Sequence, residues 1–205
     1  MAAQPTPAHV TALWDAMRAR YGTRIVDKSS AAEMKLVGWF LERIGVLDQA
    51  TFLERFTTTI GRRIYVPFTP GTPTPRHSLW SQIVICVHEH QHVEQLVRDG
   101  AVTFSLRYLA SPAARAAYEA DAYRCNLELH HWHTGQLPSP RELAERLRSY
   151  GVRDADIDVA ETTLIAAART VKAGGVITPA AKFAMQPEHA HYRCLRCGYR
   201  DSCCF

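Results

Sequence analysis

Residues 87 to 95 read VHEHQHVEQ and contain a group of residues able to bind a metal ion. On a helix, His88 and His92 project from one face about 6 Å apart, a separation that suits two ligands of one tetrahedral ion. Glu89 lies about 100° further round the helix, close enough to hold and deprotonate a water in the ion's open position. The spacing predicts a catalytic zinc site with His88 and His92 as ligands and Glu89 as general base.

The other histidines in and after this stretch are expected to serve elsewhere. His90 lies about 200° round the helix from His88, so we expect a packing or surface residue that points away from the metal. A later helix ends with His130, His131 and His133. These histidines lie about 16 Å or more along that helix from Glu119, another candidate ligand, which is too far to share one ion. A favourable position at a helix C-terminus explains these three without a metal.

A catalytic zinc takes three protein ligands, so the two histidines need a third. The stretch RAAYEADAYR offers Glu119 and Asp121, on a helix expected to begin at Ser111-Pro112. These two carboxylates lie about 200° apart round a helix, so only one of them can face the ion. The longer side chain and the small neighbours Ala120 and Ala122 favour Glu119, and Asp121 remains the alternative.

A strand-rich segment, the H-E-x-x-H helix and a later helix with E-x-D-A resemble the zincin-like metallopeptidases of the gluzincin type, over about residues 57–133. The resemblance implies that His88, His92 and Glu119 bind Zn²⁺ and that Glu89 acts as general base. It further implies that a zinc-activated water hydrolyses peptide bonds of a peptide or protein substrate.

The resemblance also implies a cleft along the edge of the sheet, which Arg62, Arg63 and Tyr65 would line. A transition-state stabiliser is still needed, and Tyr108, Tyr123 or one of the later histidines could supply it. One position departs from the family pattern. Many gluzincins place Asp or Asn four residues after the ligand glutamate to orient a histidine, and here Tyr123 occupies that position.

The elements that must position these residues are mostly helical. Apolar periodicity and capping signals predict helices over about 7–21, 31–44, 48–56, 77–98, 102–109, 112–133, 140–150 and 154–173. The segment TTTIGRRIYVP is rich in β-branched and aromatic residues and predicts one strand, or two short strands around Gly61. We therefore expect a mainly helical α+β fold with a short β region before the motif helix.

The uneven distribution of the cysteines predicts a domain over 1–185 and a Cys-rich C-terminal extension over 186–205. Two of the six cysteines, Cys86 and Cys125, lie in apolar helical patterns and should be small buried hydrophobes. The extension predicts a second, structural zinc site, with free thiols or a disulfide as the alternative. Its candidate ligands are Cys194, Cys197, Cys203 and Cys204, with His189 and His191 as further candidates.

Composition narrows the possible partners of the chain. Its 205 residues carry 24 basic and 20 acidic side chains, and the basic ones are scattered, which argues against nucleic acid. Neither a signal peptide nor a membrane-spanning run is evident, so we expect a cytoplasmic protein without a membrane anchor.

Two other functions stay open at this point. One is a non-catalytic zinc-binding structural or interaction protein that keeps a zincin scaffold, for example with a protein partner in a larger assembly such as a phage particle. The other is a helical binding module in which the histidines are incidental.

Overall fold

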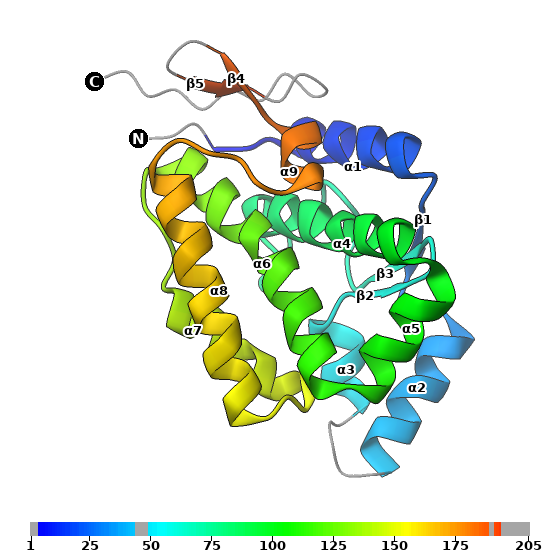
Figure 1. The fold of residues 1–205 in the computed structure, drawn as a ribbon. Helices are drawn as coiled ribbons and strands as arrows, with labels where there is room; N and C mark the ends of the chain where they lie inside the picture. Colours follow the sequence, from blue (N-terminus) through cyan, green and yellow to red (C-terminus); the bar gives the residue numbers. More distant parts are fainter. Residues whose placement is uncertain (1–3, 44–48, 189–190, 194–205) are drawn as a thin grey trace.

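The computed structural model describes residues 4–43, 49–188 and 191–193. Within these residues the fold is mainly helical α+β, with nine α-helices, one 3-10 helix, a three-stranded sheet and an antiparallel strand pair (Figure 1). The elements in chain order are α1 (Pro7–Tyr21), β1 (Arg24–Asp27), α2 (Ala32–Arg43), α3 (Gln49–Arg55), β2 (Thr58–Ile60), β3 (Arg63–Val66), α4 (Leu79–Asp99), α5 (Ala101–Ala110), α6 (Pro112–Thr134), α7 (Pro140–Glu145), the 3-10 helix (Arg146–Tyr150), α8 (Asp154–Lys172), α9 (Pro179–Ala184), β4 (Gln186–Glu188) and β5 (His191–Arg193).

The predicted fold class, mainly helical α+β with a short β region before the motif helix, is confirmed. The predicted strand segment forms two strands, β2 and β3, which Gly61 separates with a left-handed φ of 60°. The helix expected over 140–150 is α-helical only to Glu145 and continues as a 3-10 helix. Sequence reasoning missed β1 and α9, which are four and six residues long.

The three-stranded sheet has the order β1-β3-β2. The central strand β3 pairs in parallel with β1 and antiparallel with β2. Its residues Ile64, Tyr65 and Val66 are buried, whereas β2 lies at an edge of this sheet. Both β3 and the edge strand β2 contact the motif helix, β3 through the hydrophobic core and β2 through Thr59, which hydrogen-bonds to Glu89.

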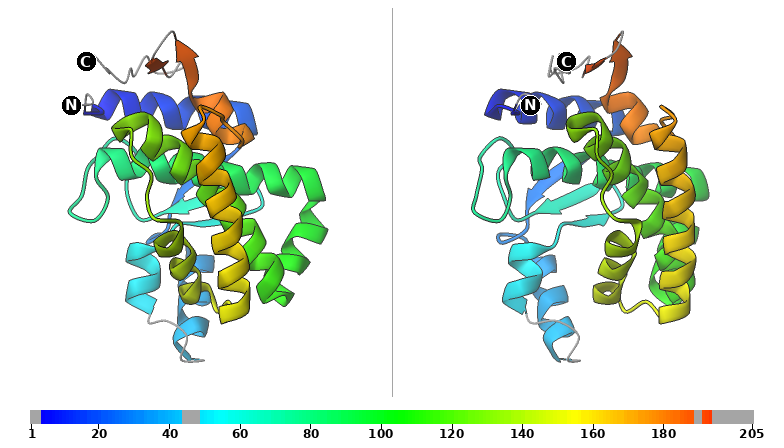
Figure 2. Two further views of the ribbon diagram at one scale, coloured as in Figure 1. Left: turned by 60° about the vertical axis from the view of Figure 1, so that its left-hand side comes forward. Right: turned by 90° about the vertical axis from the view of Figure 1, so that its left-hand side faces the viewer.

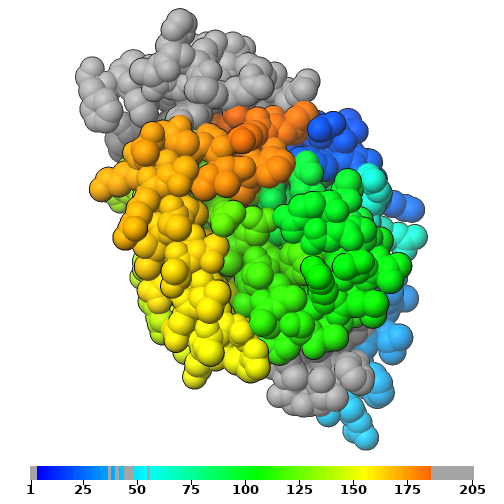
Figure 3. Space-filling model, viewed as in Figure 1, coloured from blue at the N-terminus to red at the C-terminus, as the bar shows by residue number. Residues whose placement is uncertain are grey.

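Helix α4 crosses the middle of the fold, with α1 on one side and α6 on another (Figures 1 and 2). One hydrophobic core joins α1, β3, α4, α6 and α9, and a second joins α6 with α7 and α8. Figure 3 shows α8 at the surface beside α5 and α6. Helix α6 belongs to both cores, so burial on both sides fixes its position against α4.

Serine side chains cap the two helices that carry the candidate ligands. Ser78 accepts from the backbone N–H of Ser81 at the start of α4, and Ser111 accepts from that of Ala114 at the start of α6. No helix in the described part of the chain is long and apolar enough to cross a membrane.

Candidate metal centre

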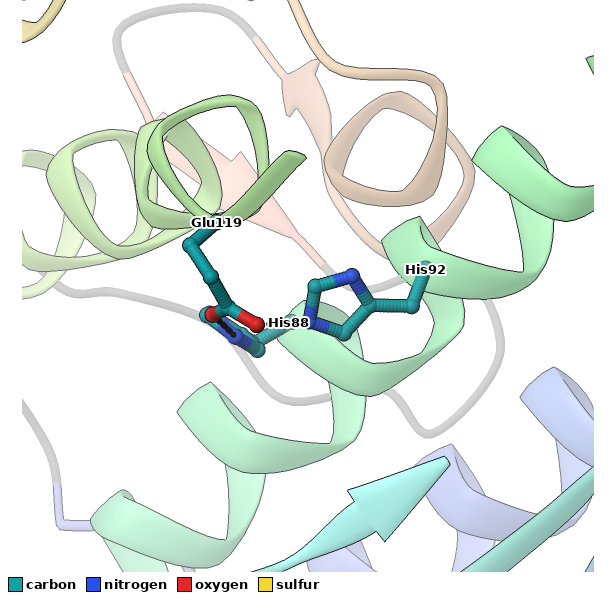
Figure 4. A group of neighbouring side chains, drawn as sticks. All are labelled: His88, His92 and Glu119. Carbon is teal, nitrogen blue, oxygen red and sulfur yellow. Dashed lines mark ion pairs between the residues drawn. The ribbon is translucent and has the colours of Figure 1, made fainter. Parts of the chain in front are cut away.

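The structure brings His88 and His92 of α4 together with Glu119 of α6, where the two helices pack (Figure 4). Nε2 of His88 lies 3.5 Å from Oε2 of Glu119, and Nε2 of His92 lies 3.5 Å from its Oε1. All three side chains are buried. Within the described residues, no other group of three or more His, Cys, Asp or Glu side chains has this geometry.

Both imidazoles are oriented by a hydrogen bond on the nitrogen that faces away from Glu119. Nδ1 of His88 donates to Oδ1 of Asn126 at 3.2 Å, and Nδ1 of His92 donates to Oε1 of Gln95 at 2.9 Å. A proton on each Nδ1 leaves the lone pair on Nε2, which is the form that binds a metal. Asn126, seven residues after Glu119, orients His88 through this hydrogen bond. It takes the role that the gluzincin pattern gives to an Asp or Asn at the position of Tyr123.

Asp121, the alternative ligand, lies away from the cluster and supports it indirectly. Its Oδ2 accepts from Nε2 of Gln95 at 2.9 Å, and its carboxylate also pairs with Arg124. Because Nε2 of Gln95 donates to Asp121 and to the carbonyl of Tyr118, its Oε1 must face His92. The geometry thus places Glu119, and not Asp121, beside both histidines.

The donor atoms fit a single metal ion. A tetrahedral ion with bonds of about 2.0–2.1 Å needs ligand atoms about 3.3–3.5 Å apart. Each Nε2 lies 3.5 Å from one oxygen of Glu119, and one ligand atom from each of the three residues lies within 4.8 Å of the other two, which is close to this spacing. Oε2 of Glu119 is buried and accepts no hydrogen bond, which is costly for a carboxylate unless a cation completes its coordination. His88, His92 and Glu119 can therefore hold one ion.

Charge in the cluster favours an ionised carboxylate and protonated phenols. Burial opposes ionisation of Glu119, but the neighbouring histidines outweigh it and hold its pKa below the usual range. Burial likewise opposes protonation of His92, and Glu119 outweighs it and raises the pKa of His92 to about 9. Tyr108, on α5, donates to Oε1 of Glu119, and burial and that carboxylate raise the pKa of its phenol.

Glu89 borders a pocket of about 500 Å³ together with His88. Oγ1 of Thr59, on the edge strand β2, donates to Oε2 of Glu89 at 2.6 Å. Lys28 supports the same strand, because its buried ammonium donates to the carbonyl of Phe56 at 2.8 Å and to Oγ1 of Thr58 at 2.9 Å. The carboxylate of Glu89 is thus held at the pocket wall by the sheet.

The two predicted tyrosines differ in their position relative to this pocket. Tyr123 lines it, with its ring centroid 5.1 Å from that of His88, whereas Tyr108 contacts Glu119 and is not part of the pocket wall. Sequence reasoning missed Tyr150, which lines the pocket from the end of the 3-10 helix. Burial raises the pKa values of Tyr123 and Tyr150, so both phenols remain hydrogen-bond donors.

Arg115 fixes the two segments that carry Tyr108 and Tyr150. Its guanidinium donates to the carbonyls of Tyr108 at 2.8 Å, Tyr150 at 2.6 Å and Leu109 at 2.9 Å. These bonds satisfy carbonyl groups at the C-terminus of α5 and join it to the 3-10 helix. One side chain of α6 therefore sets the position of both phenols around the cluster.

The remaining histidines do not join the cluster. His90 is fully buried on the α1 side of α4, where it packs against Trp14 and Tyr21. His133 stacks on Trp80 at a centroid distance of 4.0 Å, and His130 packs against the edge of the same indole. The prediction that His90 points away from the metal face is confirmed.

Some predicted residues have other partners, and some lie outside the described residues. Tyr65 is buried and donates to Glu33, Arg63 pairs with Glu33, and Arg62 donates to the carbonyl of Tyr21, so none of the three borders the pocket. Cys86 and Cys125 are buried, as predicted, and neither forms a disulfide within the described residues. The candidate ligands of the second zinc site, Cys194, Cys197, Cys203 and Cys204, lie outside the described residues, as does His189.

No protein-family model matches the chain, and no curated protein and no solved structure matches it either. The case for a function therefore depends on the geometry of the buried His-His-Glu cluster and of the pocket beside it.

Proposed function

We propose that the protein is a zinc-dependent peptidase of the zincin type, with His88, His92 and Glu119 as zinc ligands and Glu89 as general base. The observation that carries the proposal is the buried carboxylate oxygen of Glu119. It has no hydrogen-bond donor and faces two imidazoles whose other nitrogens are already bonded. An open pocket beside His88 and Glu89 gives a substrate access to this centre.

Zinc fits this donor set, because it takes nitrogen and carboxylate ligands in tetrahedral geometry. When bound, zinc supplies Lewis acidity, which acidifies a water and polarises a carbonyl. Asn126 and Gln95 accept from Nδ1 of the two imidazoles and so direct each Nε2 toward Glu119, and Tyr108 donates to the carboxylate of Glu119. These contacts fix the ligands before the metal arrives.

The chain's own groups around the pocket account for the rest of the chemistry. Glu89, held by Thr59, accepts the proton of the attacking water and can return it to the leaving amine. The phenols of Tyr123 and Tyr150 stay protonated and can donate to the negative charge that develops on the substrate's carbonyl oxygen. Tyr150 thus joins Tyr123 as a candidate stabiliser.

The decisive experiment compares the zinc-loaded wild type with Glu89→Gln on a library of unstructured peptides. We expect the variant to keep its zinc and to cleave about 10²–10⁴-fold more slowly, because the isosteric amide cannot accept the proton. Glu94→Gln, on the same helix but outside the pocket, is the matched control and should retain activity. A zinc-loaded wild type that cleaves none of the peptides would contradict the proposal and favour a non-catalytic zinc-binding scaffold.

A further inference from the structure

The pocket beside the metal centre has apolar walls and a charged rim. Its apolar and aromatic lining comes from four segments that meet around His88, and consists of Phe56, Val84, Ile85, Tyr123 and Tyr150. Walls of this kind exclude water and strengthen the electrostatic interactions within them. A charged group on the rim can therefore discriminate between substrates.

The rim carries two arginines, and they differ in their partners. Arg148 pairs with Glu145 at 2.5 Å and also with Asp154. Arg146, two residues earlier in the same 3-10 helix, is exposed, and its guanidinium forms no ion pair or hydrogen bond within the described residues. The charge of Arg146 is thus free to act on a ligand in the pocket.

Arg146 and Glu89 line the same pocket, so a ligand in the pocket lies between the two charges. Glu145 also lines the pocket, but its carboxylate pairs with Arg141 and Arg148. Within the described residues, the lining therefore has a negative charge without an ion pair at Glu89 and a positive one at Arg146. An anionic group fits only the Arg146 side, since Glu89 repels it, and a cationic side chain meets repulsion from Arg146.

We propose that Arg146 is a specificity residue that binds a carboxylate of the substrate in this pocket, beside the scissile bond. This inference rests on the proposed peptidase function. The carboxylate belongs either to an acidic side chain or to the C-terminus of the peptide, and a planar guanidinium binds both in the same bidentate manner.

The test measures binding and does not depend on cleavage. The zinc-loaded Glu89→Gln protein is titrated with fluorescein-labelled octapeptides in two matched arms. The first arm compares Glu with Gln at each position in turn, in peptides with an amidated C-terminus. The second compares a free C-terminal carboxylate with its amide in one neutral sequence. We expect one arm to show about tenfold tighter binding of the carboxylate form, as for a charged hydrogen bond at a partly desolvated site.

Adding Arg146→Gln should abolish this preference, whereas Arg169→Gln, the same change at an exposed arginine of α8 outside the pocket, should leave it unchanged. Equal or unmeasurable binding in both arms, or a preference that survives Arg146→Gln, would overturn the proposal. Cleavage by the wild type without any acidic preference would overturn this inference alone. A preference that depends on Arg146, in a protein that cleaves nothing, would overturn only the peptidase proposal.

Discussion

His90 and His92 lie two residues apart on α4, and their surroundings are opposite. Nδ1 of His90 donates to the carbonyl of Cys86 at 2.7 Å, and its Nε2 lies 2.9 Å from the hydroxyl of Thr23, which donates to it. Both ring nitrogens are thus used within the core. In His92 only Nδ1 has a neutral partner, and Nε2 faces the carboxylate of Glu119.

The comparison shows that burial alone does not distinguish a structural histidine from a candidate ligand, since both imidazoles are buried. The two histidines differ at Nε2. In His90 this nitrogen accepts from Thr23, whereas in His92 it faces the carboxylate of Glu119, whose Oε2 accepts no hydrogen bond from the described residues. On the α1 side both ring nitrogens of His90 have hydrogen-bond partners, whereas on the α6 side Oε2 of Glu119 has no donor in the described part of the chain and is a candidate ligand for a cation.

The largest effect that this comparison predicts is the loss of metal from the α6 side. His88→Ala and His92→Ala should each reduce bound zinc from about one ion per chain to background after dialysis, measured by elemental analysis. Zinc at 100 times its Kd should stabilise the wild type by about 2.7 kcal/mol, a rise in Tm of roughly 5–10 °C, and neither variant should show this rise. Zinc retained at full stoichiometry in both variants would disprove the ligand assignment.

The next effect concerns Lys28. Like His90, its side chain is buried and its polar atoms have hydrogen-bond partners. Its ammonium donates to Phe56 and Thr58 and lies 3.5 Å from the ring centroid of Phe52. Burial lowers its pKa to about 7, and the charge of Glu89 offsets this only in part. Between pH 7 and about 10.5 the unfolded chain therefore binds more protons than the folded one, so the free energy of unfolding rises with pH in that window.

The rise amounts to at most about 5 kcal/mol, and it should be absent in Lys28→Met. Urea unfolding of both proteins at pH 7 and pH 10 measures the difference. Parallel pH dependence of the two proteins would show that Lys28 keeps an ordinary pKa.

The ligand helix was predictable from the sequence, because the i, i+4 spacing and the caps are local signals. The choice of Glu119 over Asp121 was not fixed by the sequence, because it depends on the rotation of α6 about its axis. Asn126 lies seven residues after Glu119, which returns to the same helical face, so this spacing is a signal that would have found it.

Other parts were not predictable, because they depend on contacts distant in the sequence. The strand β1 has four residues and exists through its pairing with β3, about forty positions later. Helix α9 is stabilised at its start by Glu128 of α6, which accepts from the backbone N–H of Thr178 at 3.0 Å. Tyr150 is held at the pocket by contacts that are distant in the sequence, among them the hydrogen bond from Arg115 to its carbonyl and the packing of the 3-10 helix on α6 and α8.

A smaller effect is expected on the α1 side of α4. His90→Ala removes two buried hydrogen bonds and leaves a cavity, so the free energy of unfolding should fall by about 2–4 kcal/mol. Zinc stoichiometry should stay unchanged, in contrast to His92→Ala. Urea unfolding and elemental analysis of the same samples test both statements, and a loss of zinc in this variant would remove the distinction between the two sides.

The smallest effect, and the sharpest test of the comparison, concerns the amides that orient the ligands. Asn126→Ala and Gln95→Ala should each weaken zinc binding by about 10–100-fold, measured by competition with a chelator, because the imidazoles lose their fixed tautomer and orientation. Gln91→Ala is the matched control, since Gln91 also donates to Asp121 but makes no hydrogen bond to either imidazole. If Gln91→Ala weakens zinc binding as much as Gln95→Ala does, the effect comes from general disturbance of α4, and the oriented Nδ1 no longer explains why the α6 side holds a metal.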